Sequence, residues 1–302
     1  MWGNSVFATS PHFFILFIMT KWILLACISA FGSVCCAQLT KTVDYALIYD
    51  LSYIRDTSTN EYHHGYECLA IRAGDEGRFQ DFNAHFNDSI ILSFEERYPG
   101  LNTASLPKDK LNAVLDELDA TMAKWQKPHT DKYRIIKDFG KGHSKMVSIY
   151  DLTPQHLEQP LAQDWQLTAV QDTLAGMRCY QATTCYGGRN YVAWYNPDIP
   201  ISDGPYVFAG LPGLIVKISD EQNWYSFTLK RVSLEPHERF WNDYFMLSAS
   251  TPVSREVFVQ TMKERKENPK IPGLIGQEPE EVRLRRKNGF KKRFDLLLEQ
   301  NN

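Results

Sequence analysis

Cysteine is scarce in this sequence, which has six among 302 residues, and three of the six lie within the first 37. The remaining three, Cys68, Cys179 and Cys185, are an odd number, which excludes a fully paired disulfide framework within one chain. Cys179 and Cys185 enclose only the five residues YQATT. A disulfide between them requires a bend, because in an uninterrupted strand they would share one face but lie too far apart.

The short motifs that identify common catalytic sites are also absent. There is no Gly-x-Ser-x-Gly elbow, no His-Glu-x-x-His zinc helix, no phosphate loop and no Rossmann fingerprint. His63, His64 and Cys68 carry the atom types of a metal site. Neighbouring strand residues point to opposite faces, which favours a polar turn for the two histidines over metal binding. We therefore expect no catalytic residues, no metal and no cofactor.

Neither charge sign dominates the composition. The formal net charge is −3 at pH 7, which gives no reason to expect a nucleic-acid partner. One local exception is the run RLRRKNGFKKR at 283–293, with seven basic residues in eleven. A solvated helix face or tail is typical of such a run, and we favour it over binding to an anionic surface.

Charge is nearly missing from residues 1–37, where Lys21 is the one charged side chain. The apolar run 22–34 follows this lysine directly, and small residues come after it. This order is typical of an export signal. The run is shorter than the roughly 20 apolar residues that a membrane-spanning helix needs.

The expected signal peptide therefore covers residues 1–37. Cleavage after Ala37 would leave Gln38 as the mature N-terminus, and Met19 is an alternative true start. The rival interpretation is an uncleaved anchor that includes the apolar stretch 13–19. In the cleaved form the protein would be exported, and it would be periplasmic, associated with the outer membrane or secreted.

Hydrophobic periodicity predicts strands and helices in the first half of the mature chain. Alternation over 43–53 predicts a half-buried strand, and a second strand is expected at 65–73. Apolar residues at spacings of three and four from Phe79 onward predict a helix. The clearest helix signal begins at Ser105 as the N-cap and continues to Trp125.

From Lys132 to Val232 the pattern changes to short strands separated by turn residues, without long helices between them. This spacing predicts an antiparallel sheet in a β-rich α+β fold. The sheet would be curved, with a half-barrel like that of lipoprotein carriers as one form, and flanked by helices. We expect one domain over 38–302, of which 251–302 is a helical, charged C-terminal extension.

Two turn signals interrupt the apolar stretch DGPYVFAGLPGLIVKIS, which begins at Asp203. Gly204 and Pro205 predict one corner. In the hexapeptide that begins at Gly210, Pro212 sets φ near −65° and Gly213 supplies a positive φ, which together predict a type II turn. We interpret these residues as a structural device that seats the next strand against the core.

The densest group of potential binding residues lies around this stretch. Aromatic rings, one arginine and turn acids could line a ligand groove on a curved sheet. The favoured alternative is that the rings belong to the core, the arginine pairs with an acid and the aspartate caps its turn. The group consists of Arg189, Trp194, Tyr195, Asp198, Asp203, Tyr206 and Trp224.

The block from Arg178 to Asp220 resembles the signature of the GLPGLI family. The match includes Cys-x-x-Ala-Thr from Cys179, Ala-Trp-Tyr from Ala193, Asp-Gly-Pro from Asp203 and the hexapeptide GLPGLI itself. The resemblance implies an exported, β-rich protein of Gram-negative bacteria without an established activity or catalytic residues. It also implies a neighbourhood in the cell envelope that includes TonB-dependent outer-membrane receptors.

Two functions follow from these observations. The first, which we favour, is a non-enzymatic binding protein for an apolar ligand or an envelope partner. The alternative is a hydrolase or a thiol- or metal-dependent redox protein. It would use Cys179, Cys185 or the group His63, His64 and Cys68.

Overall fold

The structure, a computed structural model, describes residues 40–56, 61–98, 108–125, 133–148, 154–241 and 250–267. The predicted signal peptide, the predicted helix cap at Ser105 and the basic run 283–293 lie outside the described residues.

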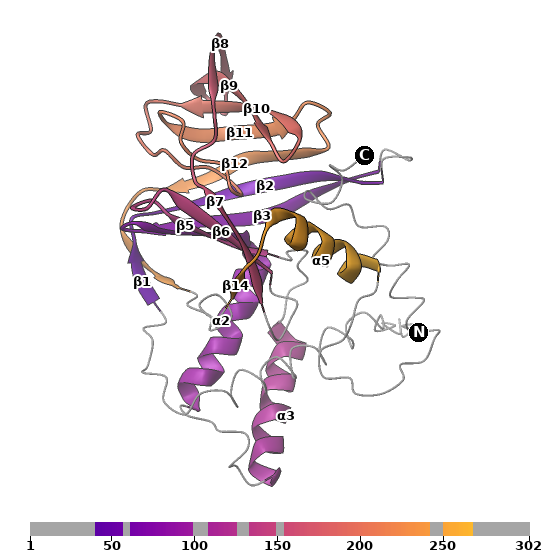
Figure 1. Ribbon diagram of the computed structural model, residues 1–302. Coiled ribbons are helices and arrows are strands. Elements are labelled where there is room, and N and C mark those ends of the chain that lie inside the picture. Colours follow the sequence, from indigo (N-terminus) through magenta and orange to yellow (C-terminus); the bar gives the residue numbers. More distant parts are fainter. Residues whose placement is uncertain are drawn as a thin grey trace, which may run out of the picture.

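One open sheet of twelve strands dominates the fold (Figure 1). Its order is β14-β7-β6-β5-β4-β3-β2-β12-β11-β10-β9-β8. Every neighbouring pair is antiparallel except β14 and β7. The strands are β2 (Tyr45–Asp56), β3 (Glu61–Ala73), β4 (Glu76–Asp81), β5 (Tyr133–Asp138), β6 (His143–Ser148), β7 (Gln155–Pro160), β8 (Gln166–Leu174), β9 (Met177–Tyr186), β10 (Arg189–Asn196), β11 (Leu214–Asp220), β12 (Tyr225–Ser233) and β14 (Thr251–Pro252).

The sheet consists of two meanders that meet in its middle. Strands β2 to β7 follow one another in space as in sequence, and so do β8 to β12. The join is the antiparallel pair β12 and β2, in which Phe227 lies opposite Leu51. Strand direction turns from one edge of the sheet to the other in Figure 1. The predicted β-rich fold with an antiparallel sheet is confirmed.

Helices lie beside both faces of the sheet. Helix α2 (Phe82–Arg97) contacts β3 and β4, whereas α5 (Arg255–Glu267) contacts β7. Helix α3 (Lys108–Trp125) packs on α2. Within the described residues, no helix combines the length and the apolar character needed to cross a membrane.

A second, two-stranded sheet pairs β1 (Thr40–Val43) with β13 (His237–Phe240). Trp241 follows β13 and is fully buried in a small hydrophobic cluster with Ile48 and Leu69. The main core lies on the other face of the large sheet, where Tyr45, Leu47 and Tyr49 of β2 meet the loop before β11.

Residues 45–49 of strand β2 are buried on both faces, which corrects the prediction of a half-buried strand for this part, whereas residues 50–53 are partly buried. Tyr45, Leu47 and Tyr49 face the main core, and Ala46 and Ile48 face the smaller cluster. The second face is covered because β1, β13 and α2 pack over it. Alternation in the sequence indicates one buried face of a strand, but it does not show that distant segments cover the other face.

The predicted helix from Phe79 begins later than expected. Phe79 lies in β4 and packs in the main core, and the helix starts at Phe82. Asp81 explains the boundary, since its Oδ1 accepts hydrogen bonds from the backbone N–H groups of Asn83 (2.8 Å) and Ala84 (3.2 Å). Such a carboxylate satisfies N–H groups of the first turn that have no partner within the helix.

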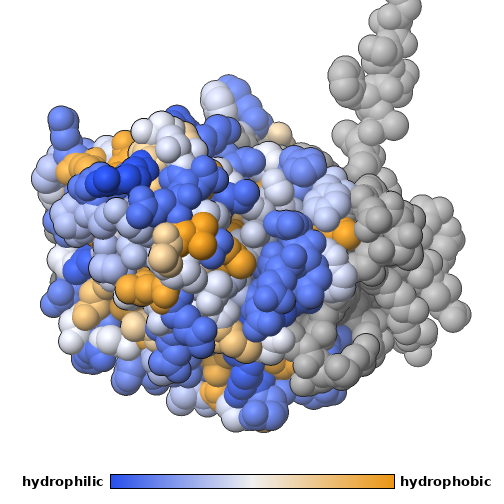
Figure 2. Space-filling view, turned by 90° about the horizontal axis from the view of Figure 1, so that it is seen from above, coloured by the Kyte–Doolittle hydropathy of each residue, from blue (hydrophilic) through white to orange (hydrophobic). Residues whose placement is uncertain are grey.

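The two edges of the large sheet differ in length and composition. Strand β14 has two residues, one of which is Pro252. Strand β8 has nine residues, and its pairing with β9 is irregular between Leu167 and Gln171. The side chains of Leu167 and Val170 are 57% and 49% exposed. Figure 2, which looks at the molecule from above, shows apolar residues of this face in small patches among hydrophilic ones.

Candidate functional site

The candidate site is the loop between β10 and β11, residues 197–213, which we call the hexapeptide loop because it ends with most of the hexapeptide. Residues 203–209 of this loop are all buried. Asp203 and Ala209 form an isolated antiparallel bridge, and the backbone N–H of Ile215 donates to the Asp203 carbonyl at 3.1 Å. The loop is thus folded onto the main core.

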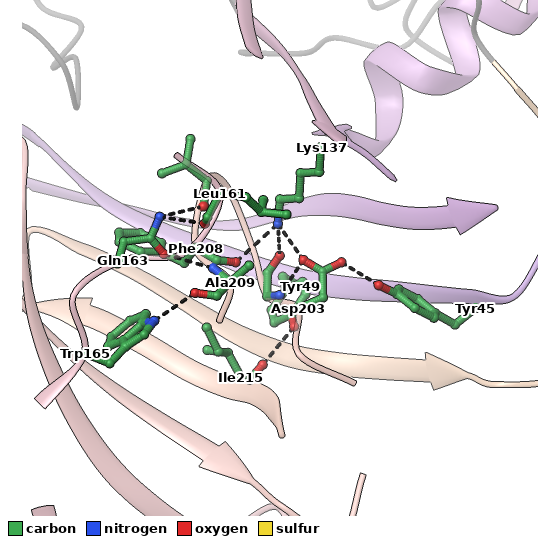
Figure 3. A network of polar contacts seen from close by, with 12 residues as sticks. Tyr45, Tyr49, Lys137, Leu161, Gln163, Trp165, Asp203, Phe208, Ala209 and Ile215 are labelled. Atoms are coloured by element: carbon green, nitrogen blue, oxygen red, sulfur yellow. Dashed lines mark hydrogen bonds and ion pairs between the residues drawn. The ribbon is translucent and has the colours of Figure 1, made fainter. Parts of the chain in front are cut away.

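Asp203 is held by groups from two distant strands (Figure 3). The ammonium of Lys137, on β5, lies 2.6 Å from Oδ1 of Asp203, and the Tyr45 hydroxyl, on β2, donates to Oδ2 at 2.7 Å. The Gly204 backbone N–H also donates to Oδ1, at 2.7 Å. The side chains of Lys137 and Asp203 are 1% and 2% exposed, so the ion pair lies entirely within the core.

The loop backbone completes the surroundings of Lys137. Its Nζ donates to the carbonyl oxygens of Gly204 at 2.8 Å and Phe208 at 3.2 Å. Burial lowers the pKa of Lys137, and the nearby Asp203 carboxylate opposes that shift. Three acceptors around one cation are the arrangement that allows a charge to be buried at all.

Two tyrosines of β2 lie against the same loop. Tyr45 donates to Asp203, and Tyr49 donates its hydroxyl hydrogen to the carbonyl oxygen of Ile215 at 2.8 Å. Burial and then the negative charge of Asp203 raise the pKa of both hydroxyl groups well above the ordinary value. Both side chains therefore stay un-ionised and act as hydrogen-bond donors.

A second set of bonds fastens the middle of the loop. The Gln163 amide donates to the Val207 carbonyl oxygen and accepts from the backbone N–H of Ala209, both at 3.0 Å. The Trp165 ring N–H donates to the Ala209 carbonyl oxygen at 2.8 Å. Both side chains come from the segment that connects β7 to β8. Figure 3 shows them beside Ala209. Buried backbone groups of the loop thus receive the partners that a sheet would otherwise supply.

The predicted corner at Gly204 and Pro205 is present, and a tight turn follows it. The Phe208 N–H donates to the Pro205 carbonyl oxygen at 3.1 Å, and Tyr206 in between has φ of 55°. A positive φ at an aromatic residue is an uncommon conformation that costs on the order of 1–3 kcal/mol. The Tyr206 ring stacks on Phe227 with centroids 6.4 Å apart, so packing stabilises the strained turn.

The turn at Pro212 and Gly213 differs from the predicted type II turn. The Gly213 N–H donates to the Leu211 carbonyl oxygen at 2.8 Å, which closes a three-residue turn around Pro212. The Leu214 N–H, which would close a type II turn, instead donates to Ile199 at 3.1 Å. Gly213 has φ of 147°, so the predicted positive φ is found.

Close packing is the second reason for glycine in this loop. A Cβ at Gly213 would lie 2.3 Å from the carbonyl oxygen of Asn196. A Cβ at Gly204 would lie 2.6 Å from Cδ1 of Ile215, and one at Gly210, where φ is 96°, would lie 2.8 Å from Cβ of Ala162. The predicted turn residues therefore act as points where the loop touches the body of the protein.

Arg189 pairs with an acid, as the favoured interpretation expected. Its Nη1 lies 3.0 Å from Oδ2 of Asp220, and these side chains are 8% and 0% exposed. The guanidinium also lies over the rings of Trp224 and Tyr225, at 5.1 and 5.9 Å from their centroids. The Tyr225 backbone N–H donates to the other oxygen of Asp220 at 2.8 Å.

The other predicted ligand-binding residues divide between core and surface. Tyr195 is buried beside Tyr180, with ring centroids 6.0 Å apart, and Trp194 is partly buried. Asp198 is exposed, and its backbone N–H donates to the Asn196 side chain at 2.7 Å. The structure brings Arg189 to Trp224 but gives Asp203 a separate set of partners, so the predicted residues serve two different buried contacts.

The cysteines lie in positions that correct the predicted disulfide. Cys179 and Cys185 both belong to the uninterrupted strand β9, so they lie about 20 Å apart along it, against the roughly 7 Å that a disulfide spans. In the part of the chain that the structure describes, Cys68, Cys179 and Cys185 form no disulfide. Burial raises the pKa of Cys179, which keeps this thiol protonated.

His63 and His64 lie within β3 and not in the polar turn that we expected. His63 stacks on Tyr53 with centroids 5.5 Å apart, whereas Nδ1 of His64 lies 3.0 Å from the Ser52 hydroxyl. Cys68 is buried farther along the strand, opposite Tyr49. Within the described ranges, no three His, Cys, Asp or Glu side chains gather closely enough to hold a metal ion.

Sequence reasoning missed the groups that hold the loop: Lys137, Tyr45, Tyr49, Gln163 and Trp165. One signal for Lys137 was available. In the predicted strand YRIIKDF, Lys137 shares the parity of Ile135, so it occupies a position that alternation assigns to the core. A lysine at such a position requires a buried acid as its partner.

Comparisons with known proteins match the region of this loop. A family model described as "Protein of unknown function (Porph_ging)" matches residues 181–217, from β9 through the whole loop into β11. A sequence comparison with curated proteins finds no match.

Solved structures of PNGF-II in two crystal forms are similar to the chain over 75% of its length. For the P21 form the TM-score is 0.46 at 10% identity, and for the C2 form it is 0.45 at 11% identity. The match covers 34% of those proteins, so the chain spans about a third of their length. The family model, by contrast, covers the hexapeptide loop and the strands on either side of it.

Proposed function

We propose that the protein is a non-enzymatic binding protein of the cell envelope that engages a protein partner through the edge strand β8. The observation that carries this proposal is the exposure of Leu167 and Val170, at 57% and 49%, along a nine-residue strand at the edge of the sheet.

The composition of β8 supports strand addition. Natural edge strands are commonly protected by lysine, proline or a very short length. Strand β8 contains neither lysine nor proline, and Asp172 is its one charged residue. Its regular stretch after Gln171 offers backbone groups, and the irregular stretch before it presents Val170. An extended segment of a partner can pair with such an edge and cover the apolar side chains.

The internal contacts of the predicted ligand residues favour a protein partner over an apolar small molecule. Arg189 is paired with Asp220, and Asp203 is paired with Lys137, in each case inside the core. These charges serve the fold, so they are not presented to a ligand. The cysteine alternative has less support, because the buried Cys179 thiol has a raised pKa.

The envelope address rests on the sequence before the described residues. Lys21 followed by the apolar run 22–34 supports export, and the resemblance to the GLPGLI family supports the same compartment. N-terminal sequencing of the protein from a periplasmic or outer-membrane fraction should give Gln38. A cytoplasmic protein that retains Lys21 would contradict the proposal.

The test of the partner site uses two matched variants. Val170→Lys changes the proposed edge, and Leu234→Lys changes an apolar residue with the same 49% exposure near the end of β12. Purified wild-type and variant proteins would be crosslinked to envelope fractions, and partners would be identified by mass spectrometry. A TonB-dependent receptor is the partner class that the family resemblance suggests.

The expected result is an envelope protein captured by the wild type and by Leu234→Lys but lost with Val170→Lys. Equal capture by all three would exclude β8 as the site. A co-purifying apolar molecule that is retained by all three, with no captured protein, would favour the small-ligand function.

A further inference from the structure

The contact between Lys137 and Asp203 places an amine beside an acyl group in the core. Nζ lies 2.6 Å from Oδ1, and neither side chain is more than 2% exposed. We propose that Lys137 and Asp203 condense to form an isopeptide bond, which ties β5 covalently to the hexapeptide loop. This modification is independent of the proposed binding function.

The surroundings favour the neutral forms that such a reaction needs. Separate buried charges carry a large desolvation penalty, which transfer of one proton from the ammonium to the carboxylate removes. Burial, which is the larger effect, acts in this direction by lowering the pKa of Lys137, and the Asp203 carboxylate opposes it. Phe208, Tyr49 and Ile215 are fully buried around the pair, so water has little access to it.

The loop carbonyl groups orient the amine. The oxygens of Gly204 and Phe208, at 2.8 and 3.2 Å from Nζ, can accept the two N–H hydrogens of a neutral lysine. The third direction around Nζ is occupied by the Asp203 carboxyl group. After the proton has moved to the carboxylate, the nitrogen lone pair faces the Asp203 carboxyl group, whose Oδ1 lies 2.6 Å from Nζ. This proximity replaces much of the entropy of a bimolecular encounter.

Two donors on the acyl side stabilise developing charge. The Gly204 backbone N–H donates to Oδ1 at 2.7 Å, where negative charge would collect in a tetrahedral intermediate. The Tyr45 hydroxyl donates to Oδ2 at 2.7 Å, on the oxygen that would leave. The Tyr45 hydroxyl keeps its proton because burial raises its pKa.

The reaction balances without any co-reactant. One proton first moves from the Lys137 ammonium to the Asp203 carboxylate. Nζ then attacks Cγ, the C–N bond forms, and the bond from Cγ to Oδ2 breaks. A second proton from Nζ goes to Oδ2, which leaves as water. Nothing is oxidised or reduced, and two buried charges become one amide.

The decisive measurement is peptide mapping of the wild-type protein after denaturation and trypsin digestion. An isopeptide bond blocks cleavage after Lys137, so peptide 135–141 would appear joined to peptide 190–217. The joined species would be lighter than the sum of the two peptides by the mass of one water. If both peptides appear only unjoined, with cleavage after Lys137, the pair is an ion pair only and the proposal is wrong.

Variants separate the chemistry from the fold. The bond would close a loop between positions 66 residues apart, so the boiled wild-type chain should migrate faster on a denaturing gel than Lys137→Arg. The gel compares unfolded chains, so a folding defect in Lys137→Arg does not affect it. Tyr45→Phe should lower the rate of bond formation about tenfold or more in newly synthesised chains, followed by pulse labelling and the same gel. Equal mobility of wild type and Lys137→Arg would overturn the proposal, and an unchanged rate in Tyr45→Phe would overturn the assisting role of Tyr45.

Discussion

The two buried ion pairs differ in what they join. Lys137 and Asp203 connect β5 to the hexapeptide loop, 66 positions away, which lies between strands and is not one of them. Arg189 and Asp220 connect the ends of β10 and β11, two strands already paired by a backbone ladder. The first pair fixes the position of a segment, whereas the second reinforces an existing contact.

The two pairs also differ in how far the neighbouring groups depend on them for hydrogen bonds. Lys137 bonds to two carbonyl oxygens of the loop, so its loss leaves backbone groups without a donor. Arg189 lies under the rings of Trp224 and Tyr225, and Asp220 has a backbone N–H besides the arginine. A buried pair should therefore matter most where it replaces regular secondary structure.

The largest effect is expected for Lys137→Met. Asp203 would remain in the core as a carboxylate that has lost Lys137, whether as its cation or as its covalent partner, so the free energy of unfolding should fall by about 3–5 kcal/mol. Urea denaturation measures the change. Lys141→Met is the matched control, because its side chain is 80% exposed, and it should change stability by less than about 0.5 kcal/mol. Similar values for the two variants would contradict the role given to the buried pair.

Gly213→Ala tests the loop without changing either pair. The added Cβ would meet the Asn196 carbonyl oxygen at 2.3 Å, and φ is 147°, so we expect a loss of about 2–4 kcal/mol. Gly176→Ala serves as control, since φ there is 77° but no atom lies within 4 Å of the added group. It should lose only about 1 kcal/mol. Equal melting temperatures for the two variants would show that the close approach is unimportant.

Arg189→Met should have a smaller effect than Lys137→Met. Asp220 keeps the Tyr225 N–H, and the methionine side chain can still pack on Trp224, so we expect a loss of about 2 kcal/mol. The same urea titration gives the value. A loss as large as that of Lys137→Met would remove the difference that we draw between the two pairs.

Acid should weaken the fold through a group outside both pairs. Burial, together with Arg239 and Arg134, lowers the pKa of His85 to about 3. The unfolded chain, with a histidine pKa near 6.5, binds a proton that the folded protein does not. Stability should therefore fall as the pH drops from about 6.5 toward 3, by about 1.4 kcal/mol per unit. His85→Gln should flatten this slope in urea titrations at several pH values, and an unchanged slope would exclude His85 as its source.

Val170→Lys should have the smallest effect on stability. The side chain lies on the edge strand, belongs to neither pair and is already 49% exposed. We expect the free energy of unfolding to change by less than about 0.5 kcal/mol. Thermal unfolding checks this value. A larger loss would mean that β8 contributes to the core, which would weaken its proposed role as a partner site.

Much of the sheet could be predicted because its strands carry their own pattern. Alternation identified the strand at 43–53, and the turn residues between 132 and 232 indicated an antiparallel sheet. Strand β7, with the sequence QHLEQP, was missed because polar residues interrupt its apolar positions. Burial of one face of β2 was predicted from its alternation. Burial of the other face, which carries Ala46 and Ile48, was not predicted, because the segments that cover it are distant in the sequence.

Sequence patterns predicted the loop of the candidate site but not the side chains that hold this loop in place. Asp203, Gly204 and Gly213 were recognised from turn chemistry, which is local. Lys137 and Tyr45 reach Asp203 only because β2 pairs with β12 and joins the two meanders. No local pattern specifies which strands meet, so the ion pair could not be assigned from the sequence.

The unequal edges of the sheet limit how copies and partners can add to it. Strand β14 ends one side with two residues and a proline, which lacks the N–H that a further strand would use. Strand β8 forms the other edge, to which we propose that a strand of a partner adds. Among the described strands of the large sheet, one receptive edge gives a valence of one, because a strand that docks there leaves no equivalent edge of that sheet for the next. Such a protein can form a pair or cap a partner, but edge pairing alone would not extend it into a fibre.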